Sequence, residues 1–234
     1  MTLLLQAREL IAGYRKRAVV GPIDLDLGDN DTVALVGPNG VGKSTILKTL
    51  AGVIPPVAGV ITYQNRAVTR SPAYAHARNG LVLVGEHRAN VLRTLTVREN
   101  LDLAAGQAKT PSTFNPAGLF PRLGERRRQR AGTLSGGELQ MLSLAMALSL
   151  SPRCLLLDEP SAGLAPIVLQ EVKQALVRLR SAGLSIVVAE QRPDVVLGLC
   201  DRVATVSAAG LSFLEPDADL SGEALVSRYF NGGA

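Results

Sequence analysis

The sequence GPNGVGKS occupies residues 37–44 and places three glycines ahead of a lysine and a serine. It fits the pattern of a phosphate-binding loop, or P-loop, between an apolar run at Thr32–Val36 and a helical pattern that begins near Lys43. Glycines in such a loop let backbone N–H groups turn toward phosphate oxygens, and the helix N-terminus adds positive potential. A glycine-rich turn without a ligand is the alternative, which the correct flanking elements disfavour. The stretch therefore predicts a strand, a phosphate cradle and a helix in succession.

The side chains of this stretch suit a nucleotide with a magnesium ion. We expect Lys43 to reach the β- and γ-phosphates, Ser44 to offer its hydroxyl to Mg²⁺, and Thr45 to assist at the phosphates. The predicted nucleotide-binding residues of this stretch, called the cradle below, are Gly37, Pro38, Asn39, Gly40, Val41, Gly42, Lys43, Ser44 and Thr45.

Short apolar runs and helical patterns alternate along the rest of the chain. The runs predict buried, mainly parallel strands at Thr32–Val36, Leu81–Val84, Cys154–Leu157, Ser185–Ala189 and Arg202–Val206. Helical patterns between them cover Lys43–Leu50, Glu138–Leu150 and Val168–Ala182. This alternation predicts an α/β fold with a doubly wound core sheet. Residues 23–27, IDLDL, alternate with period two and predict a half-exposed strand in an N-terminal antiparallel part.

Residues 86–132 differ from this pattern. Prolines at positions 111, 116 and 121 interrupt them, and helical periodicity is patchy between Val97 and Ala105. We interpret the region as a helical insertion, which gives a helical subdomain at about residues 87–150 within a single domain spanning residues 1–234. Residues 222–230, GEALVSRYF, predict a short amphipathic helix near the end of the chain.

The composition, with 47% hydrophobic and 19% charged residues, is typical of a compact globular protein. No apolar stretch approaches the roughly 18 residues of a membrane-spanning helix, and the first residues lack the features of a secretion signal, so we expect a cytoplasmic location. Cys154 and Cys200 lack metal-ligand spacing, and Cys154 is expected to be a buried thiol. The net charge is +5, but the basic run ERRRQR at residues 125–130 has no neighbouring aromatic residue for base stacking. We expect a solvated face there and no nucleic-acid partner.

Residues 155–159, LLLDE, end an apolar strand with two carboxylates. Open α/β sheets gather their ligands at the carboxyl ends of strands, so this position suits Mg²⁺. We expect Asp158 to contact the metal through water and Glu159 to polarise the water that attacks the γ-phosphate. Two solvated carboxylates are the ordinary alternative, which a P-loop in the same chain disfavours.

Residues 134–140, LSGGELQ, place a serine and two glycines where a run of strong helix formers begins. A chain that combines this stretch with a P-loop resembles the ATP-binding cassette (ABC) ATPases, and the resemblance reaches nearly the whole sequence. It implies the P-loop NTPase fold of an ABC cassette, in which Ser135, Gly136 and Gly137 contact the γ-phosphate of ATP held by a second cassette. Bare backbone donors and a helix dipole suit such an anion site. A head-to-tail dimer with two ATP molecules at its interface is thus implied.

Two further positions take their roles from the same resemblance. Tyr14, in IAGYRK, matches the aromatic residue that stacks on adenine, with a surface tyrosine as the alternative. Residues 161–166, SAGLAP, match the loop that crosses the dimer interface, and Ala165 stands where many ABC proteins have aspartate.

Glu86 and Gln191 depart from the common pattern of these ATPases. Glu86 stands where glutamine is usual, in the loop that reaches toward the membrane subunits, and Gln191 stands where the switch histidine is usual. A loss of function is one explanation; a habit of a subfamily is another, which we favour. Because glutamine cannot carry the proton or charge of histidine, we expect modest turnover that rises when the permease is present. The predicted catalytic residues are Lys43, Glu86, Glu159 and Gln191, and the predicted metal-site residues are Ser44, Glu86 and Asp158.

The chain is similar to the branched-chain (hydrophobic) amino acid and urea/amide uptake ATPases at both departures. The same similarity extends to the short stretches FPRL (120–123), ERR (125–127), AGTLS (131–135) and GLAP (163–166). It implies an ATPase on the inner face of the cell membrane that uses ATP and Mg²⁺ to power solute import. The implied partners are permease subunits, a second cassette that is identical or a sister chain, and indirectly a periplasmic or lipid-anchored solute-binding protein.

Two other classes of function stay open. A soluble ABC ATPase acting on DNA or ribosomes is disfavoured, because the sequence has neither a long coiled-coil insertion nor a second cassette. A nucleotide-binding regulatory partner that hardly hydrolyses ATP is suggested by Glu86 and Gln191. The presence of Lys43, Asp158 and Glu159 argues against that second alternative.

Overall fold

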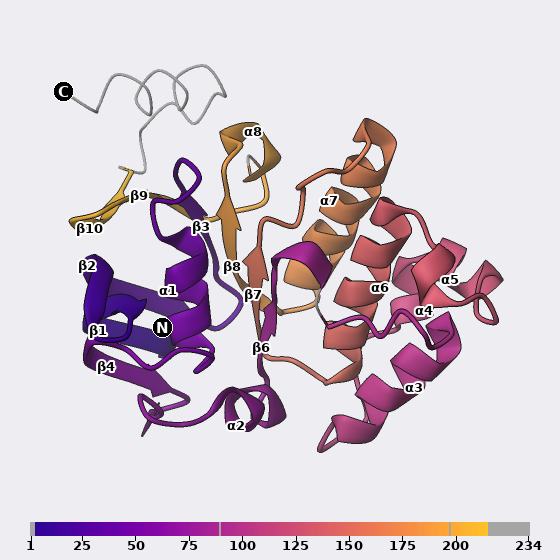
Figure 1. The fold of residues 1–234 in the computed structure, drawn as a ribbon, viewed down its shortest axis with the longest axis horizontal. Coiled ribbons are helices and arrows are strands. Elements are labelled where there is room, and N and C mark those ends of the chain that lie inside the picture. The colour runs from indigo at the N-terminus through magenta and orange to yellow at the C-terminus, as the bar shows by residue number, and fades with distance from the viewer. Residues whose placement is uncertain (1–2, 89, 197, 215–234) are drawn as a thin grey trace.

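The computed structural model describes residues 3–88, 90–196 and 198–214, in which the strands form two sheets (Figure 1). The larger sheet has the strand order β10-β9-β3-β8-β7-β6. Its strands are β3 (Thr32–Val36), β6 (Leu81–Val84), β7 (Cys154–Asp158), β8 (Ser185–Glu190), β9 (Arg202–Ser207) and β10 (Gly210–Phe213). The first five of these pair in parallel, and β10 pairs antiparallel with β9. The prediction of a mainly parallel core sheet is confirmed.

The parallel strands are buried because other elements cover both faces of this sheet. Every residue of β3, β7 and β8 is buried, as expected for short apolar runs without alternation. Cys154 lies in β7, and burial raises the pKa of its thiol. The expectation of a buried thiol at this position is therefore confirmed.

The smaller sheet is antiparallel and has the strand order β2-β1-β4-β5. Its strands are β1 (Leu3–Tyr14), β2 (Arg17–Gly28), β4 (Ala58–Tyr63) and β5 (Arg66–Ala67). Residues 23–27 belong to β2, where Ile23, Leu25 and Leu27 are buried while Asp24 is exposed. The predicted half-exposed antiparallel strand is thus confirmed within a longer one.

Helix α1 (Lys43–Leu50) lies between the two sheets (Figure 1). Its side chains Ile46, Leu47 and Leu50 are fully buried in one core cluster with residues from both sheets. This packing fixes the start of α1 beside the carboxyl end of β3, so the intervening loop has a rigid support on each side.

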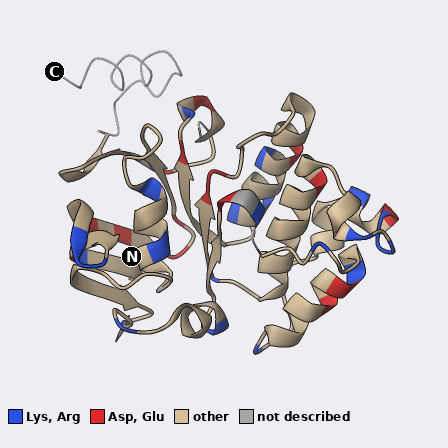
Figure 2. Cartoon of the chain, viewed as in Figure 1, with Lys and Arg blue, Asp and Glu red and all other residues tan. Residues whose placement is uncertain are grey.

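The remaining helices cover the opposite face of the core sheet and its ends. They are α2 (Ala73–Arg78), α3 (Val97–Gln107), α4 (Pro116–Leu119), α5 (Pro121–Glu125), α6 (Gly136–Ser149), α7 (Pro166–Ser181) and α8 (Pro193–Val196), with short 3-10 turns η1 (Glu86–Arg88) and η2 (Ala131–Thr133). Figure 1 shows α3, α4, α5 and α6 gathered on the side remote from the antiparallel sheet. The basic run at residues 125–130 follows α5, where Figure 2 shows charges of both signs, and its arginines are solvent-exposed.

Two helices start two residues earlier in the structure than the sequence predicted, and each ends one residue earlier. Helix α6 begins at Gly136 rather than at Glu138, because Ser135 and Glu138 form a capping box that draws both glycines into the first turn. Helix α7 begins at Pro166 rather than Val168, since proline is well tolerated at the first helical position. The predicted helix at 222–230 lies outside the described residues. None of the described helices is long and apolar enough to cross a membrane.

Candidate functional site

The cradle connects β3 to α1 and takes its shape from glycines in the left-handed region. Gly40 has a φ of 82° and Gly42 a φ of 111°, conformations that side chains with a Cβ rarely adopt. A Cβ at Gly42 would also lie 2.9 Å from Cγ1 of Val20. Valine side chains of β2 therefore pack closely behind the cradle, and only glycine fits at position 42.

Lys43 is almost fully buried at the centre of the cradle. Its Nζ donates to the carbonyl oxygens of Gly37 at 2.7 Å and Pro38 at 3.1 Å. The same atom lies 3.2 Å from Oε1 of Glu159. The two residues that the sequence assigned to phosphate binding and water activation therefore face each other across the site.

Asp158 and Ser44 form the second polar pair of the site. The Ser44 hydroxyl donates to Oδ1 of Asp158 at 2.8 Å, and Oδ2 of Asp158 is buried without a hydrogen-bond partner among the described residues. Burial raises the pKa of Asp158, which means that a positive charge nearby would stabilise its ionised form. A hydroxyl next to an unpartnered carboxylate oxygen fits Mg²⁺. The described residues contain no cluster of three or more His, Cys, Asp or Glu residues, so phosphate and water oxygens would complete the coordination.

A cavity of about 300 Å³ brings six residues of the cradle together with Glu86 and Glu159. Its lining residues are Asn39, Gly40, Gly42, Lys43, Ser44, Thr45, Glu86 and Glu159. Glu86 comes from η1 after β6, whereas Glu159 follows β7 and has a φ of 46°, in the left-handed region. Such a backbone conformation is uncommon for glutamate and is found most often at functional sites.

The end of β8 adds a buried carboxylate that the sequence analysis did not single out. Glu190 is 2% exposed and accepts hydrogen bonds from the Ser161 backbone N–H at 3.0 Å and the Ser161 hydroxyl at 2.9 Å. Burial raises the pKa of Glu190 to about 7. The next residue, Gln191, is exposed and is not among the residues that line the cavity. The sequence feature that could have pointed to Glu190 is its position, a glutamate directly after the apolar run at residues 185–189.

Tyr14 lies beside a different hollow. Its side chain is 46% exposed at the end of β1. The hollow has a volume of about 530 Å³ and is lined by Gly13, Tyr14, Arg15, Lys16, Ile54, Pro55, Pro56 and Val57. The structure therefore places Tyr14 outside the phosphate cavity.

Ser135, Gly136 and Gly137 lie at the start of α6 and not in the phosphate cavity. Ser135 and Gly136 are exposed, and a Cβ at Gly136 would meet open space. Gly137 is buried, and a Cβ there would approach Cγ1 of Val168 to 2.6 Å. One glycine thus leaves the surface open, while the other allows α6 to pack against α7.

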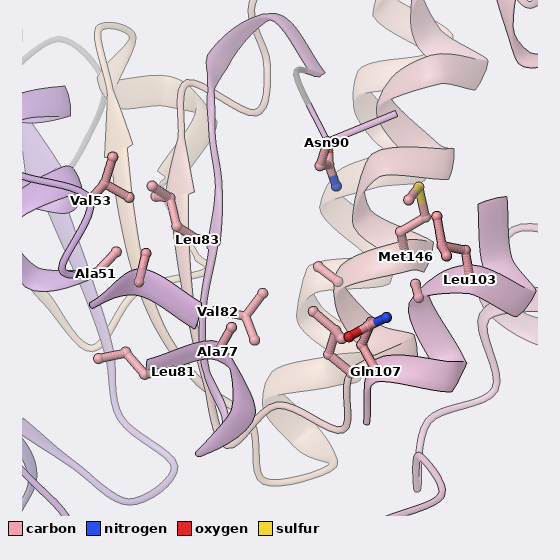
Figure 3. A pocket seen from close by; sticks show the side chains of 14 residues that line it. Ala51, Val53, Ala77, Leu81, Val82, Leu83, Asn90, Leu103, Gln107 and Met146 are labelled. Atoms are coloured by element: carbon pink, nitrogen blue, oxygen red, sulfur yellow. The ribbon is translucent and has the colours of Figure 1, made fainter. Parts of the chain in front are cut away.

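A second, mainly apolar cavity of about 350 Å³ separates β6 and α2 from α3 and α6 (Figure 3). Figure 3 shows Leu81, Val82 and Leu83 on one wall, with Leu103 and Met146 on the other. Leu103 is 45% exposed, so this rim reaches the surface. We call this cavity the apolar groove.

Comparison with known proteins identifies the family. The protein-family model for ABC transporters matches residues 20–162, which is more than half of the chain. A high-affinity branched-chain amino acid transport ATP-binding protein, BraG of Pseudomonas aeruginosa, is 38% identical over 81% of this chain and 82% of its own length. A probable branched-chain amino acid transport ATP-binding protein, LivF of Archaeoglobus fulgidus, is 33% identical over 90% of this chain and 91% of its own. LptB of Acidithiobacillus ferridurans, a lipopolysaccharide export system ATP-binding protein, is 34% identical over 86% of each.

Solved structures share the fold at lower sequence identity. An ATP-binding cassette of an ABC transporter in its ADP conformation has a TM-score of 0.83 and 19% identity, and the match covers 99% of this chain and 98% of that one. A dimeric, post-hydrolysis ATP-binding cassette bound to ADP and phosphate has a TM-score of 0.76 and 19% identity, with 91% and 99% covered. The fold expected from the sequence is therefore confirmed.

The sheet order, the cradle between β3 and α1, and the carboxylates after β7 define a P-loop ATPase of the cassette type. The chain belongs to the ABC transporter family, in which it is an ATP-binding subunit that hydrolyses ATP.

Proposed function

We propose that this subunit powers the import of branched-chain amino acids, or of urea or amides, across the cell membrane. The observation that carries the proposal is the 38% identity to BraG over four fifths of both chains. The resemblance of Glu86 and Gln191 to the uptake ATPases, noted from the sequence, adds to it. The LptB relatives favour a second candidate, an ATPase of a lipopolysaccharide export system, and the experiment must separate the two.

In the proposed mechanism ATP binds with its adenine on Tyr14 and its phosphates in the cradle. Lys43 exchanges the carbonyl oxygens of Gly37 and Pro38 for oxygens of the β- and γ-phosphates, which its buried position 3.2 Å from Glu159 supports. That movement separates Lys43 from Glu159, whose carboxylate then orients the attacking water and accepts its proton. Phosphoryl transfer depends mainly on such positioning and on charge.

Ser44 and Asp158 would hold Mg²⁺, with Glu86 at the edge of the same cavity. When bound, the metal neutralises charge that develops on the phosphate oxygens. The buried Oδ2 of Asp158 supports this assignment, because a carboxylate oxygen without a partner costs free energy until a cation or a water molecule satisfies it.

A second cassette would complete each site. Ser135, Gly136 and Gly137 would approach the γ-phosphate bound to the partner, and the exposure of Ser135 and Gly136 supports that role. Gln191 would hydrogen-bond the γ-phosphate on its own subunit. Because its amide carries no charge at any ordinary pH, we expect slow turnover by the cassette alone and faster turnover with the permease.

The apolar groove is proposed to receive a helix of the permease on the inner face of the membrane. Two features support this partner: Leu103 on the apolar rim is 45% exposed, and Asn90 lines the groove four residues after Glu86 of the nucleotide cavity. A change at the nucleotide would thereby reach the groove through one short segment. The substitution Leu103→Asp, on the exposed rim, is expected to abolish permease binding without changing the ATPase activity of the cassette alone.

Affinity purification from the native cell tests the transport assignment. The tagged wild-type chain, its Leu103→Asp variant and its Glu159→Gln variant are solubilised gently with the membranes, and the co-purifying proteins are identified by mass spectrometry. We expect a multi-span permease, a second cassette and, through the permease, a solute-binding protein whose ligand supports ATP-dependent uptake. Recovery of lipopolysaccharide export components would favour the second candidate. Recovery of soluble proteins or nucleic acid alone, or equal ATPase rates for wild type and Glu159→Gln, would contradict the proposal.

A further inference from the structure

Arg88 joins three segments that the proposed function uses separately. It ends η1, the turn that brings Glu86 into the nucleotide cavity. Its Nε donates to Oε1 of Gln140 at 3.1 Å, and its Nη2 donates to the carbonyl oxygen of Ala162 at 3.1 Å. One side chain therefore connects η1, helix α6 and the loop at residues 161–166.

Each acceptor of Arg88 is rigidly attached to a functional position. Gln140 is 5% exposed and lies one helical turn after Gly136, so a displacement of Gln140 moves the start of α6. The Ala162 backbone N–H donates to the carbonyl oxygen of Glu159 at 3.1 Å, which places Ala162 in the turn that follows the proposed base. Arg88 thus touches the supports of both halves of an ATP site.

The energetics of Arg88 point to function rather than to stability. Both acceptors of Arg88 are uncharged oxygens, and the residue is partly buried. Its φ of 56° is also a left-handed conformation, which costs free energy for a residue with a Cβ. A partly buried cation on a strained backbone, held by neutral groups, is a costly way to join two helices and a loop.

A neighbouring pair fixes the same segment to α6 without touching the loop. The Ser143 hydroxyl donates to Oδ1 of Asn90 at 2.6 Å, and Nδ2 of Asn90 donates to the Ser143 carbonyl oxygen at 3.1 Å. Gln140 and Ser143 are three residues apart, so they lie on one face of α6. Arg88 and Asn90 therefore each bind α6, and of these two residues Arg88 extends the connection to Ala162.

We propose that Arg88 is a positioning residue that transmits nucleotide occupancy of the cradle to the start of α6 and to the loop at residues 161–166 of the same subunit. The inference rests on the proposed nucleotide role of Glu86. Nucleotide that engages Glu86 shifts η1, and the two hydrogen bonds of Arg88 move Gln140 and Ala162 with it. The planar guanidinium is required because its donors point in two fixed directions, which the single ammonium group of lysine does not reproduce.

Hydrogen–deuterium exchange of the full chain tests this coupling. The Glu159→Gln background prevents hydrolysis, and the protein is kept at a concentration where light scattering shows monomers in the presence of MgATP. In the Arg88-containing protein we expect ATP to slow exchange in the cradle and to change exchange at residues 135–140 and 161–165. In Arg88→Met the cradle response is expected to remain and both distant responses to disappear.

Arg122→Met is the matched control, because Arg122 also joins the helical side to the core, through a 2.8 Å ion pair with Glu171, without contacting η1. With ATP, Arg122→Met is expected to show the same changes in hydrogen–deuterium exchange as the protein that retains Arg88, both in the cradle and at residues 135–140 and 161–165. In an otherwise wild-type chain, Arg88→Met is expected to lower kcat about tenfold or more and to change the Kd of ATP for the monomer by less than about threefold.

The outcomes separate this inference from the proposed function. If ATP fails to protect the cradle in the Arg88-containing protein, the nucleotide role itself is wrong. If ATP protects the cradle but the distant responses are absent in that protein, or persist in Arg88→Met, the Arg88 inference is overturned. Should Arg88→Met not fold, Arg88→Lys keeps the positive charge but loses the geometry of both hydrogen bonds, and Gln140→Met removes only the bond to α6. Arg88→Lys is then expected to weaken both distant responses, and Gln140→Met mainly the response at 135–140; unchanged responses in both variants would overturn the inference.

Discussion

Two helices of this protein have glycine at or next to their first residue, yet their N-termini are built in opposite ways. Helix α1 follows Gly42 and has neither a side-chain cap nor an acidic residue in its first turn, as far as the described residues show. Helix α6 follows Ser135, whose hydroxyl accepts from the Glu138 N–H while the Glu138 carboxylate accepts from the Ser135 N–H. The first N-terminus is open to an anion, and the second is already capped by its own chain.

The charges beside the two N-termini increase the difference. Lys43 adds a buried positive charge at the first helical position of α1. Glu138 adds a negative charge to the first turn of α6, which Arg126 offsets through a 2.6 Å ion pair. An anion is attracted to the start of α1 by the subunit alone, whereas the start of α6 attracts one weakly. In the proposed mechanism, ATP would therefore bind first at the start of α1, and the α6 end of a second cassette would join the site afterwards.

The largest predicted effect comes from removing the positive charge at the N-terminus of α1. Lys43→Met removes the buried cation and is expected to lower the ATPase rate by at least about 10²-fold and to weaken MgATP binding by the monomer. Steady-state hydrolysis and calorimetric titration measure the two effects. Lys173→Met, which removes a partly exposed lysine of α7, is the control. An unchanged ATP affinity in Lys43→Met would contradict the role assigned to α1.

Alanine at each of the two glycines in the first turn of α6 is expected to change the free energy of unfolding in opposite directions. Gly137→Ala forces a Cβ against the stiff side chain of Val168 and is expected to lower the free energy of unfolding by about 1–3 kcal/mol. Gly136→Ala meets open space and is expected to raise it by about 0.5–1 kcal/mol, since alanine favours the helix. Chemical denaturation of the two variants measures both changes. Equal effects of the two substitutions would show that the α6–α7 contact is misplaced.

The buried carboxylate of Glu190 is expected to make the stability of the folded protein depend on pH. Its pKa is raised from the ordinary value of 4.5 to about 7, so between these values the folded protein binds more protons than the unfolded chain. The contribution of Glu190 to stability is therefore fully present below the unfolded pKa and is lost as the pH rises through about 7. Glu190→Gln is expected to make the fall in Tm across this range shallower. Glu171→Gln, at the partly exposed ion pair with Arg122, is the control, and identical slopes for wild type and Glu190→Gln would contradict the assignment.

The smallest predicted effect concerns the charge at the start of α6. Glu138→Gln keeps a side chain that can complete the capping box but removes the ion pair with Arg126. We expect the free energy of unfolding to fall by about 0.5 kcal/mol or less, because the Arg126 side chain is 43% exposed and solvent screens the pair. Arg126→Gln should give a similar value, and the double variant should be no worse than either. A loss several times larger would mean that the charge, and not the hydrogen bonds, holds this cap.

The sequence could predict the α1 side of the site because its chemistry is local. The glycine positions of the cradle, Lys43 and Ser44 are contiguous, and the flanking run Thr32–Val36 has the observed limits of β3. The carboxylates that meet them, Asp158 and Glu159, end a run of leucines, where parallel strands place ligand groups. Pattern and tertiary structure agree at these positions.

The positions that connect the site to the rest of the molecule could not be predicted in the same way. Arg88 reaches Gln140 and Ala162 across 52 and 74 residues of sequence, and Glu190 reaches Ser161 across 29. No pattern in the residues that flank Arg88 or Glu190 in the sequence indicates these partners. The long strand β1 was also missed, because its bulged pairing and mixed burial blur the alternation that marks a strand.

The most direct measurement of the difference between the two N-termini is the affinity of the isolated monomer for MgATP, determined by calorimetry in a Glu159→Gln background. Lys43→Met, at the open N-terminus of α1, is compared with Gly136→Asp, which adds a negative charge at the start of α6. The account predicts at least about tenfold weaker binding for Lys43→Met and a change within about twofold for Gly136→Asp. Equal weakening in the two variants would contradict it, because the start of α6 would then belong to the ATP site of its own subunit.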